Sequence, residues 1–164
     1  LGAEALTYSY YHIHGINTTV LRYFTVYGPA GRPDMAPYKF AQWILKGSPI
    51  QIYGNGHQTR DFTYVDDIAR GTVLAALNFA NGWDVINLGG GMEPVSIIDF
   101  IRLLEDSLKT NAKIVHCPPV SGDMLHTSAD IKKAAILLNW KPAVRLKDGL
   151  QQLAQWHLES FNRF

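Results

Sequence analysis

Two glycine-rich turns are the first candidates for chemistry, because glycine lets backbone amides approach a phosphate closely. The run Gly54-Asn55-Gly56-His57-Gln58-Thr59 is the nearest match to a dinucleotide-binding fingerprint. Thr59 replaces the third glycine of that fingerprint, and an extended run follows where the fingerprint requires a helix. We therefore predict a hairpin turn. Gly89-Gly90-Gly91 lies between an expected strand and an expected helix, but it also lacks the required spacing.

Charge and cysteine content exclude several classes of protein. The 164 residues carry 15 Lys and Arg against 14 Asp and Glu, without the basic run that a nucleic-acid surface requires. No apolar stretch reaches the roughly 18 residues of a membrane span, so we expect a cytoplasmic protein. The single Cys117 cannot form an intrachain disulfide or a metal cluster, and we predict a buried small hydrophobic residue rather than a nucleophile. An anionic ligand must therefore be bound by a few well-placed cations.

The elements that would position such residues alternate between strands and helices, which favours an α/β fold. Helices are expected over 1–14, 38–46, 66–80, 130–139 and from Ser96 to Leu108, with a last amphipathic helix from about Leu146. Strands are expected over 18–26, 49–53, 61–65, 84–88 and 113–117.

The most specific feature is a series of motifs in a fixed order. They are Leu21-Arg22-Tyr23-Phe24-Thr25-Val26-Tyr27-Gly28-Pro29, Arg32-Pro33-Asp34-Met35, Tyr53-Gly54-Asn55-Gly56, Arg60-Asp61-Phe62-Thr63-Tyr64-Val65-Asp66-Asp67, Asn87-Leu88-Gly89 and Gly122-Asp123. This series resembles the C-terminal part of the extended short-chain dehydrogenase/reductases that modify nucleotide sugars with NAD, and it is most similar to the UDP-glucuronate 4-epimerases. The resemblance covers essentially the whole chain.

The resemblance implies a fold and a division into domains. Residues 1–26 would form the last elements of a Rossmann-type parallel sheet, and residues 27–164 a small α/β substrate-binding region. The segment 60–80 would pack back on the Rossmann sheet. In that family most of the NAD contacts come from a preceding domain, and we expect Tyr23 and Phe24 to contribute to cofactor binding here.

The family's catalytic Tyr and its closely following Lys would lie just upstream of the position that matches Leu1. Tyr8, Tyr10 and Tyr11 have no Lys at the required spacing. A phenol needs a neighbouring cation to act as a base, because its pKa is normally about 10. We therefore assign no catalytic residue to this chain. The first residues lack an initiator Met and a helix cap, so we expect that the chain begins inside a larger protein.

Four residues match positions that hold the nucleotide in this family. Arg60 and Arg32 match phosphate-binding arginines, whose planar donors suit phosphate oxygens. Asp123 matches the acceptor of the ribose hydroxyls, and Tyr53 matches a position that lines the uracil pocket. The alternatives are a solvated Arg60 or its ion pair with Asp66, a loop ion pair for Arg32, an exposed turn for Asp123 and a core position for Tyr53.

Two further positions concern the sugar. Thr25 stands where relatives specific for neutral hexoses commonly carry Asn, and Thr at this position resembles the glucuronate enzymes. Lys39 matches a basic position that approaches the sugar's C6 carboxylate, although a solvated helix face is equally compatible. Val120 departs from relatives that carry a further phosphate-binding Arg, which weakens the case for a galactose-type epimerase.

The resemblance implies an enzyme that inverts C4 of UDP-glucuronate through a 4-keto intermediate, and a fragment that is inactive alone. It also implies a homodimer, in which the helix carrying Tyr8, Tyr11 and Ile13 joins a helical bundle. A 4,6-dehydratase, a decarboxylase or a non-catalytic binding module remain alternatives.

Overall fold

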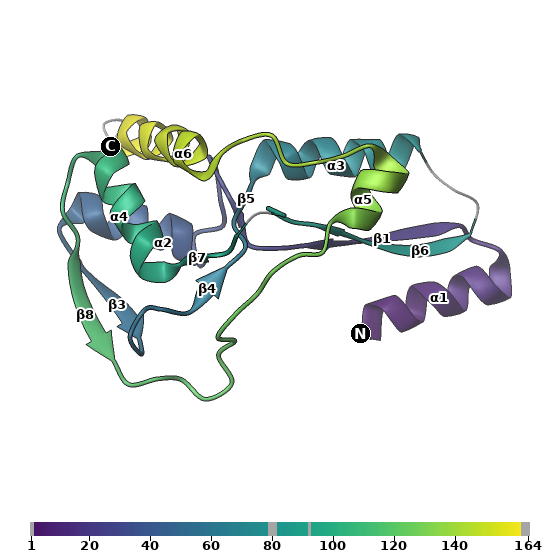
Figure 1. Ribbon diagram of the computed structural model, residues 1–164, viewed down its shortest axis with the longest axis horizontal. Coiled ribbons are helices and arrows are strands. Elements are labelled where there is room, and N and C mark those ends of the chain that lie inside the picture. Colours follow the sequence, from purple (N-terminus) through teal and green to yellow (C-terminus); the bar gives the residue numbers. More distant parts are fainter. Residues whose placement is uncertain (1, 79–81, 92, 162–164) are drawn as a thin grey trace.

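The computed structural model describes residues 2–78, 82–91 and 93–161, and the elements form two lobes along the long axis of the molecule (Figure 1). The helices are α1 (Gly2–His14), α2 (Ala36–Lys46), α3 (Val65–Leu77), α4 (Ile97–Leu108), α5 (Lys132–Leu138) and α6 (Leu146–Phe161). The strands are β1 (Thr18–Tyr23), β2 (Val26–Tyr27), β3 (Pro49–Tyr53), β4 (Thr59–Arg60), β5 (Thr63–Tyr64), β6 (Trp83–Leu88), β7 (Val95–Ser96) and β8 (Lys113–Cys117). The predicted α/β class is confirmed.

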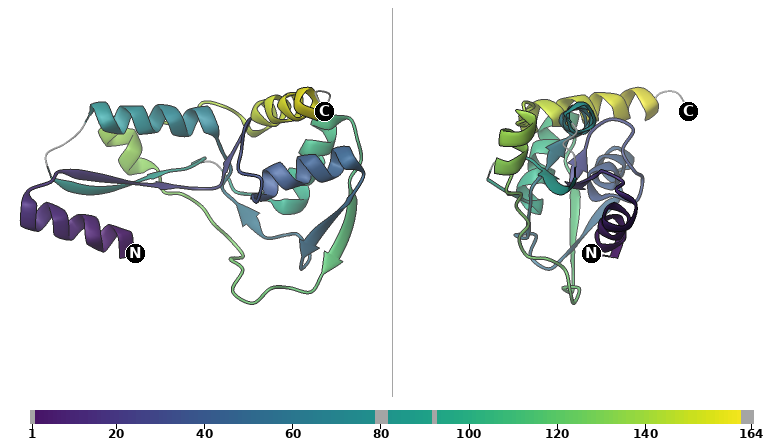
Figure 2. Two further views of the ribbon diagram at one scale, coloured as in Figure 1. Left: turned by 180° about the vertical axis from the view of Figure 1, so that it is seen from behind. Right: turned by 90° about the vertical axis from the view of Figure 1, so that its right-hand side faces the viewer.

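The first lobe is built on the parallel pair of β1 and β6, in which Val20 lies opposite Val85 and Leu21 opposite Ile86. A parallel pair of apolar strands must be covered on both faces. Helices α3 and α5 lie over one face and α1 over the other (Figures 1 and 2). The buried side chains between strands and helices are Ile68, Ala75, Ile86, Leu88, Ala134, Leu138 and Trp140.

The second lobe packs helices α2, α4 and α6 beside the parallel pair of β3 and β8. Phe100, Ile101 and Leu104 of α4 recur at helical spacing and are fully buried. Ser96 begins this helix, and its Oγ accepts a hydrogen bond from the backbone N of Asp99 at 3.0 Å. The predicted N-cap is confirmed, and it fixes the start of the helix that carries most of this core.

Two short strand pairs, β2 with β5 and β4 with β7, lie between the lobes. The pair of β2 and β5 divides the strand predicted over 18–26. The backbone N of Phe24 still donates to the carbonyl of Leu88 in the first lobe, at 3.1 Å. The carbonyl of Thr25 accepts instead from the N of Thr63, at 2.9 Å, and β2 then pairs with β5. The chain therefore passes from one sheet to the next at Thr25.

The hairpin predicted at 54–59 is wrong. Strand β3 pairs with β8 and strand β4 with β7, so in the described structure the two strands that flank the turn do not pair with each other. Gly54 and Gly56 have positive φ angles, and Asn55 Oδ1 accepts from the N of His57 at 3.0 Å. The local turn was predictable, whereas partners about 35 to 64 residues away in sequence are invisible to local patterns.

Helix limits differ from the predicted ones at three places. Helix α2 begins two residues earlier, at Ala36, with Pro37 in its first turn, where a missing N–H costs nothing. Helix α5 is shorter than the predicted 130–139, and Asn139 ends it in a left-handed conformation, with φ at 48°. Helix α3 ends at Leu77 with Asn78 as its C-cap, before the predicted limit at about Ala80, and residues 79 and 80 lie outside the described residues.

Cys117 is half-buried at the end of β8 and lines a cavity, so the prediction of a buried core residue is wrong. Strand β8 is mostly exposed and holds Cys117 at the sheet edge. None of the helices within the described ranges is long and apolar enough to cross a membrane.

His157 in α6 makes the stability of this fold dependent on pH. The side chain is 5% exposed, and burial lowers its pKa to about 4. The unfolded imidazole titrates near pH 6.5, so the unfolded chain binds the proton first as the pH falls. We expect this titration to leave the free energy of unfolding unchanged above pH 6.5. As the pH falls to about 4.5, the free energy of unfolding should decrease by about 2–3 kcal/mol.

Urea unfolding of the wild type and of His157→Phe at both pH values measures this effect. On acidification, His157→Phe is expected to lose less stability than the wild type. The control His14→Phe, at an exposed position, is expected to lose as much stability as the wild type. Equal losses for the wild type and His157→Phe would contradict the assignment.

Candidate functional site

The first part of the candidate site lies where β1 ends. In open α/β sheets, ligands bind outside the carboxyl ends of the strands, where the connections diverge. Here a cavity of about 520 Å³ is lined by Tyr23, Phe24, Thr25, Gly28, Arg32, Met35 and Val65, among others. The Tyr23 hydroxyl forms a hydrogen bond with Thr72 Oγ1 at 2.9 Å, which ties this aromatic side chain to α3. The two predicted cofactor residues therefore lie in one cavity with Thr25.

A second cavity, of about 250 Å³, brings four of the predicted substrate residues together. Thr25 from the crossing between the lobes, Tyr53 from the end of β3, Arg60 from β4 and Asp123 from the loop before α5 all line it. These residues are as far as 98 positions apart in the sequence. A hydroxyl, an aromatic ring, a guanidinium and a carboxylate thus face one small space.

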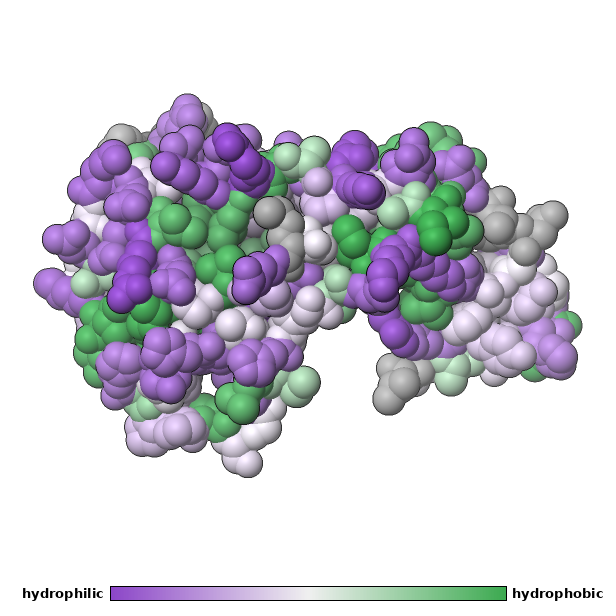
Figure 3. All heavy atoms as spheres, in the orientation of Figure 1, coloured by the Kyte–Doolittle hydropathy of each residue, from purple (hydrophilic) through white to green (hydrophobic). Residues whose placement is uncertain are grey.

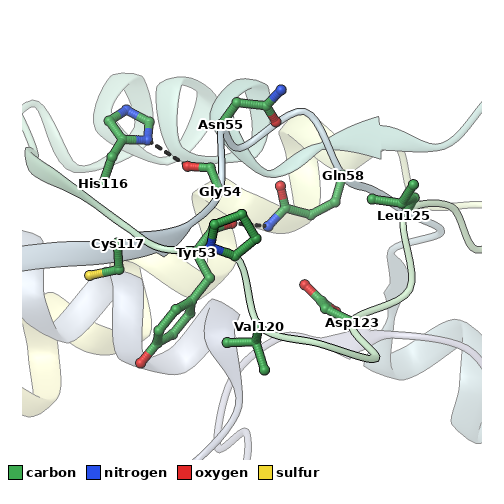
Figure 4. Close-up of a pocket in the computed structure, with 10 residues that line it drawn as sticks. Tyr53, Gly54, Asn55, Gln58, His116, Cys117, Val120, Asp123 and Leu125 are labelled. Carbon is green, nitrogen blue, oxygen red and sulfur yellow. Dashed lines mark hydrogen bonds between the residues drawn. The ribbon is translucent and has the colours of Figure 1, made fainter.

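A third cavity, of about 830 Å³, lies between the ends of β3 and β8 and the loop that carries Asp123 (Figure 4). Tyr53 and Val120 line it together with Gln58, whose side-chain Nε2 donates to the carbonyl of Tyr53 at 3.1 Å. The Asp123 carboxylate approaches it from the opposite loop (Figure 4). The wall is mainly apolar, with few polar groups, as in many small-molecule sites.

The three cavities share lining residues and therefore adjoin one another. Thr25 and Met35 line both the first and the second cavity, and Tyr53, Gln58 and Asp123 line both the second and the third. The result is one path from the carboxyl end of β1 to the end of β8. Such an extended path suits a long ligand with chemically distinct parts. The space-filling view shows an open notch between the two lobes on one side of the molecule (Figure 3).

Arg60 is the cation at the middle of this path. Its Nη1 donates to the carbonyl oxygens of Thr59, at 2.9 Å, and Met124, at 2.6 Å. Its Nη2 donates to Asp123 Oδ1 at 2.7 Å, and this contact is an ion pair. Within the described ranges, the two remaining N–H donors, on Nε and Nη2, bond to no protein atom. The alternative in which Arg60 pairs with Asp66 is wrong.

Asp61 anchors the strand that carries Arg60, and sequence analysis missed this role. Its carboxylate is 3% exposed and accepts hydrogen bonds from the backbone N of Gly90, at 2.6 Å, and of Ala129, at 2.8 Å. A Cβ atom added to Gly90 would lie 2.2 Å from Asp61 Oδ1, so the glycine permits this close approach. The glycine run therefore supplies an amide to a buried carboxylate.

Arg32 lies in the first cavity and not beside Arg60. It is 74% exposed and forms a two-point ion pair with Asp34, at 2.5 and 3.1 Å. The hydrogen bond with Arg32 holds the pKa of Asp34 below its usual value, and the nearby positive charge of Lys39 acts in the same direction. The same hydrogen bond raises the pKa of Arg32. Asp34 is therefore paired with Arg32 and lies within the electrostatic influence of Lys39.

Lys39 is half-buried in the first turns of α2. Among the described residues that line the three cavities, Lys39 does not appear. Asp34, on which the charge of Lys39 acts, belongs to the loop that precedes α2. It lies two residues after Arg32, which lines the first cavity. The lysine thus lies at the edge of the site.

Sequence analysis did not predict Gln58 or His116, which both line the third cavity. His116 Nδ1 forms a hydrogen bond with the carbonyl oxygen of Gly54, at 2.9 Å. Gln58 belongs to the glycine-rich turn at 54–59, and its polar side chain was the only sequence feature that could have indicated a role in binding. His116 lay in an ordinary strand pattern and gave none.

The fold and the site define an α/β protein with an elongated, partly apolar path at the strand ends and one central arginine, an arrangement that suits a small-molecule ligand. Comparison with protein families is more specific. The model of the NAD dependent epimerase/dehydratase family matches residues 1–89, more than half of the chain. The chain belongs to this family, as the motifs predicted.

Similar proteins of known name and structure agree with this assignment. The chain is 47% identical to a UDP-glucuronate 4-epimerase of Thermodesulfobacterium geofontis and 42% identical to UDP-glucuronate 4-epimerase 3 of Arabidopsis thaliana, over 97% of its own length in both cases. These matches cover 49% and 40% of the relatives' lengths, so the chain spans about half, or somewhat less, of each.

A solved structure of UDP-glucuronic acid 4-epimerase from Bacillus cereus, in complex with UDP-glucuronic acid and NAD, matches with a TM-score of 0.90 at 42% identity. The match covers 96% of this chain and 50% of the solved one. The fold described above is therefore shared with about half of that solved chain.

Proposed function

We propose that this chain forms the substrate-binding part of an NAD-dependent UDP-glucuronate 4-epimerase. The main support is the path of three cavities, in which Arg60 lines the middle cavity and Tyr53 and Asp123 line both the middle and the third cavity. A nucleoside diphosphate sugar has the same order of parts: a base, a ribose, two charged phosphates and a sugar. Relatives named for UDP-glucuronate are 42–47% identical to the chain over nearly its whole length.

We assign one part of the ligand to each cavity. Uracil lies in the third cavity against Tyr53 and Val120, where an aromatic face and an apolar side chain suit a base. Arg60 binds the diphosphate through its two free donors, since guanidinium groups bind phosphate oxygens in pairs. Asp123 accepts hydrogen bonds from the ribose hydroxyls, and the sugar extends past Thr25 into the first cavity.

The residues at the end of β1 fit the nicotinamide end of NAD. Tyr23, Phe24, Gly28 and Gly31 give the first cavity a largely apolar wall in which a flat ring could pack beside the sugar. NAD supplies reversible hydride transfer at C4 of the sugar, through a 4-keto sugar that is reduced on its other face. The chain's own contribution is to hold the sugar at Thr25 and to exclude water there.

We further propose that the catalytic base and most of the NAD contacts belong to the half of the relatives' length that this chain does not span, and that the 164 residues alone are inactive. Residues 1–26 then complete a Rossmann-type sheet, and residues 27–164 form the substrate-binding region. The exposed Tyr8 and Ile13 of α1 support a homodimer contact in the full-length enzyme. A cytoplasmic location remains our expectation.

Turnover by the full-length protein tests this function. UDP-glucuronate and NAD are incubated with the enzyme produced from its complete coding sequence, and the product is identified by NMR. We expect a mixture of the two C4 epimers with the C6 carboxylate intact. Release of carbon dioxide would indicate a decarboxylase, and a 4-keto-6-deoxy product a dehydratase. UDP binding without any product would indicate a binding module.

Lys39 provides a prediction about sugar specificity. Lys39→Ala in the full-length enzyme is expected to lower kcat/KM for UDP-glucuronate by roughly 10- to 100-fold, because a charge-assisted contact to the C6 carboxylate is lost. Binding of UDP alone is expected to change less than about twofold, since UDP has no such carboxylate.

Lys46→Ala, at the far end of the same helix, is the matched control and should leave both quantities unchanged. Calorimetry with UDP and initial rates with UDP-glucuronate provide the two readouts. An equal loss of UDP binding and of turnover in Lys39→Ala would contradict a role at the carboxylate.

A further inference from the structure

The Arg60–Asp123 ion pair places the two residues assigned to different parts of the nucleotide in contact with each other. Asp123 Oδ1 accepts from Arg60 Nη2 at 2.7 Å, across 63 positions of sequence. The Arg60 side chain is 18% exposed and that of Asp123 is 42% exposed. The guanidinium is thus held in the wall, while the carboxylate lies on the solvent side of the pair.

The loop that carries Asp123 is fastened to β4 by further contacts that do not need the carboxylate. Arg60 Nη1 donates to the carbonyl of Met124, and the N of Thr59 donates to the carbonyl of Leu125 at 2.8 Å. Thr59 Oγ1 and His126 Nδ1 form a hydrogen bond at 3.0 Å. The Asp123 side chain can therefore leave Arg60 by rotation while the loop stays in place.

We propose that Asp123 acts as an internal anion on Arg60, and that a nucleoside diphosphate binds by exchanging partners. In addition to the two free donors of Arg60, a phosphate oxygen takes the Nη2 donor that now bonds to Asp123, and the released carboxylate turns to the ribose hydroxyls beside it. This proposal rests on the function proposed above, and it adds a specificity role for the ion pair.

Because of this exchange, the binding free energy that a ligand gains at Arg60 depends on whether it also provides a partner for Asp123. A ligand with phosphates and no ribose can use the two free donors of Arg60, but it meets the Asp123 carboxylate on the same guanidinium and offers that carboxylate no new partner. A ligand with both groups satisfies Arg60 and Asp123 together. The pair therefore selects nucleoside diphosphates over pyrophosphate, which carries the same kind of charge and is abundant wherever nucleotides are activated.

Titration of the chain with UDP and with pyrophosphate, in wild type and variants, tests the exchange. In Asp123→Asn and Asp123→Ala the competing charge is absent, so pyrophosphate is expected to bind about two- to fivefold more tightly, as for a partly exposed ion pair. UDP is expected to bind about fivefold more weakly to Asp123→Ala, which has no acceptor for the ribose, and to lose less affinity for Asp123→Asn.

The control is Asp106→Asn, an exposed residue of α4 that removes the same charge outside the three cavities. It should change both affinities by less than about twofold. Weaker or unchanged pyrophosphate binding in both Asp123 variants would overturn the proposal, and so would an equal change for the two ligands. Failure of the proposed function is a separate result, because it would appear as an absence of UDP binding to the wild type.

Discussion

Replacing Arg60 by alanine is expected to weaken UDP binding by roughly 30- to 1,000-fold, which corresponds to about 2–4 kcal/mol. Arg60 is the central cation of the cavity path, and it keeps two N–H donors free toward a ligand within the described structure. Arg32 cannot replace it, because Arg32 lines the first cavity and is paired with Asp34. Calorimetry with UDP measures the loss.

Arg60→Lys separates charge from geometry in this experiment. Lysine keeps the positive charge but not the planar fork, so we expect only partial recovery of affinity. The control is Arg102→Ala, which removes an exposed arginine on α4 that lies outside the site and should bind UDP as the wild type does. A loss of less than about threefold in Arg60→Ala would show that the diphosphate binds elsewhere.

The largest effect on stability is expected at Asp61. Its buried carboxylate accepts from the backbone N of Gly90 and of Ala129, which come from distant parts of the chain. Asp61→Ala leaves both amides without this acceptor, and we expect it to lower the free energy of unfolding by about 3–5 kcal/mol. Asp61→Asn keeps one acceptor oxygen and should lose less.

Urea unfolding at neutral pH measures these changes. The control is Asp66→Ala, five residues along the chain, whose exposed carboxylate in the first turn of α3 should contribute less than about 1 kcal/mol. If Asp61→Ala were as stable as Asp66→Ala, the two amides would have other partners, and Asp61 would not anchor the Arg60 strand.

Elements whose signal is local were predictable from the sequence. The first helix, the strands at 49–53 and 113–117 and the Ser96 cap agree with the structure nearly residue for residue. In each case the apolar spacing or the capping residue lies within the element itself. The family was also predictable, because its motifs are short, ordered and rich in unusual residue types.

Features that depend on distant partners were not predictable. The apolar run of 18–26 looks like one strand, yet the chain changes sheet at Thr25 because β6 and β5 offer partners in different sheets. The turn at 54–56 looks like a hairpin, yet β8 supplies the partner of β3. Local patterns describe the residues of a strand and not the strand beside it.

The candidate site shows the same division. The resemblance to the family identified Arg60 and Asp123 separately as ligand-binding candidates. Their contact across 63 positions and the anchoring by Asp61 appeared only in the structure, which also bears out the loop ion pair considered as the alternative for Arg32. These contacts determine which donors are free, and therefore how the site can bind an anion.

The most direct test of the account is a structure of the chain with UDP bound. We expect the diphosphate oxygens at roughly 2.7–3.2 Å from the Arg60 nitrogens, and the uracil in the third cavity against Tyr53 and Val120. A diphosphate bound at Arg32, or a nucleotide that lies outside the three connected cavities, would contradict the assignment of this chain as the UDP-sugar-binding part of the enzyme.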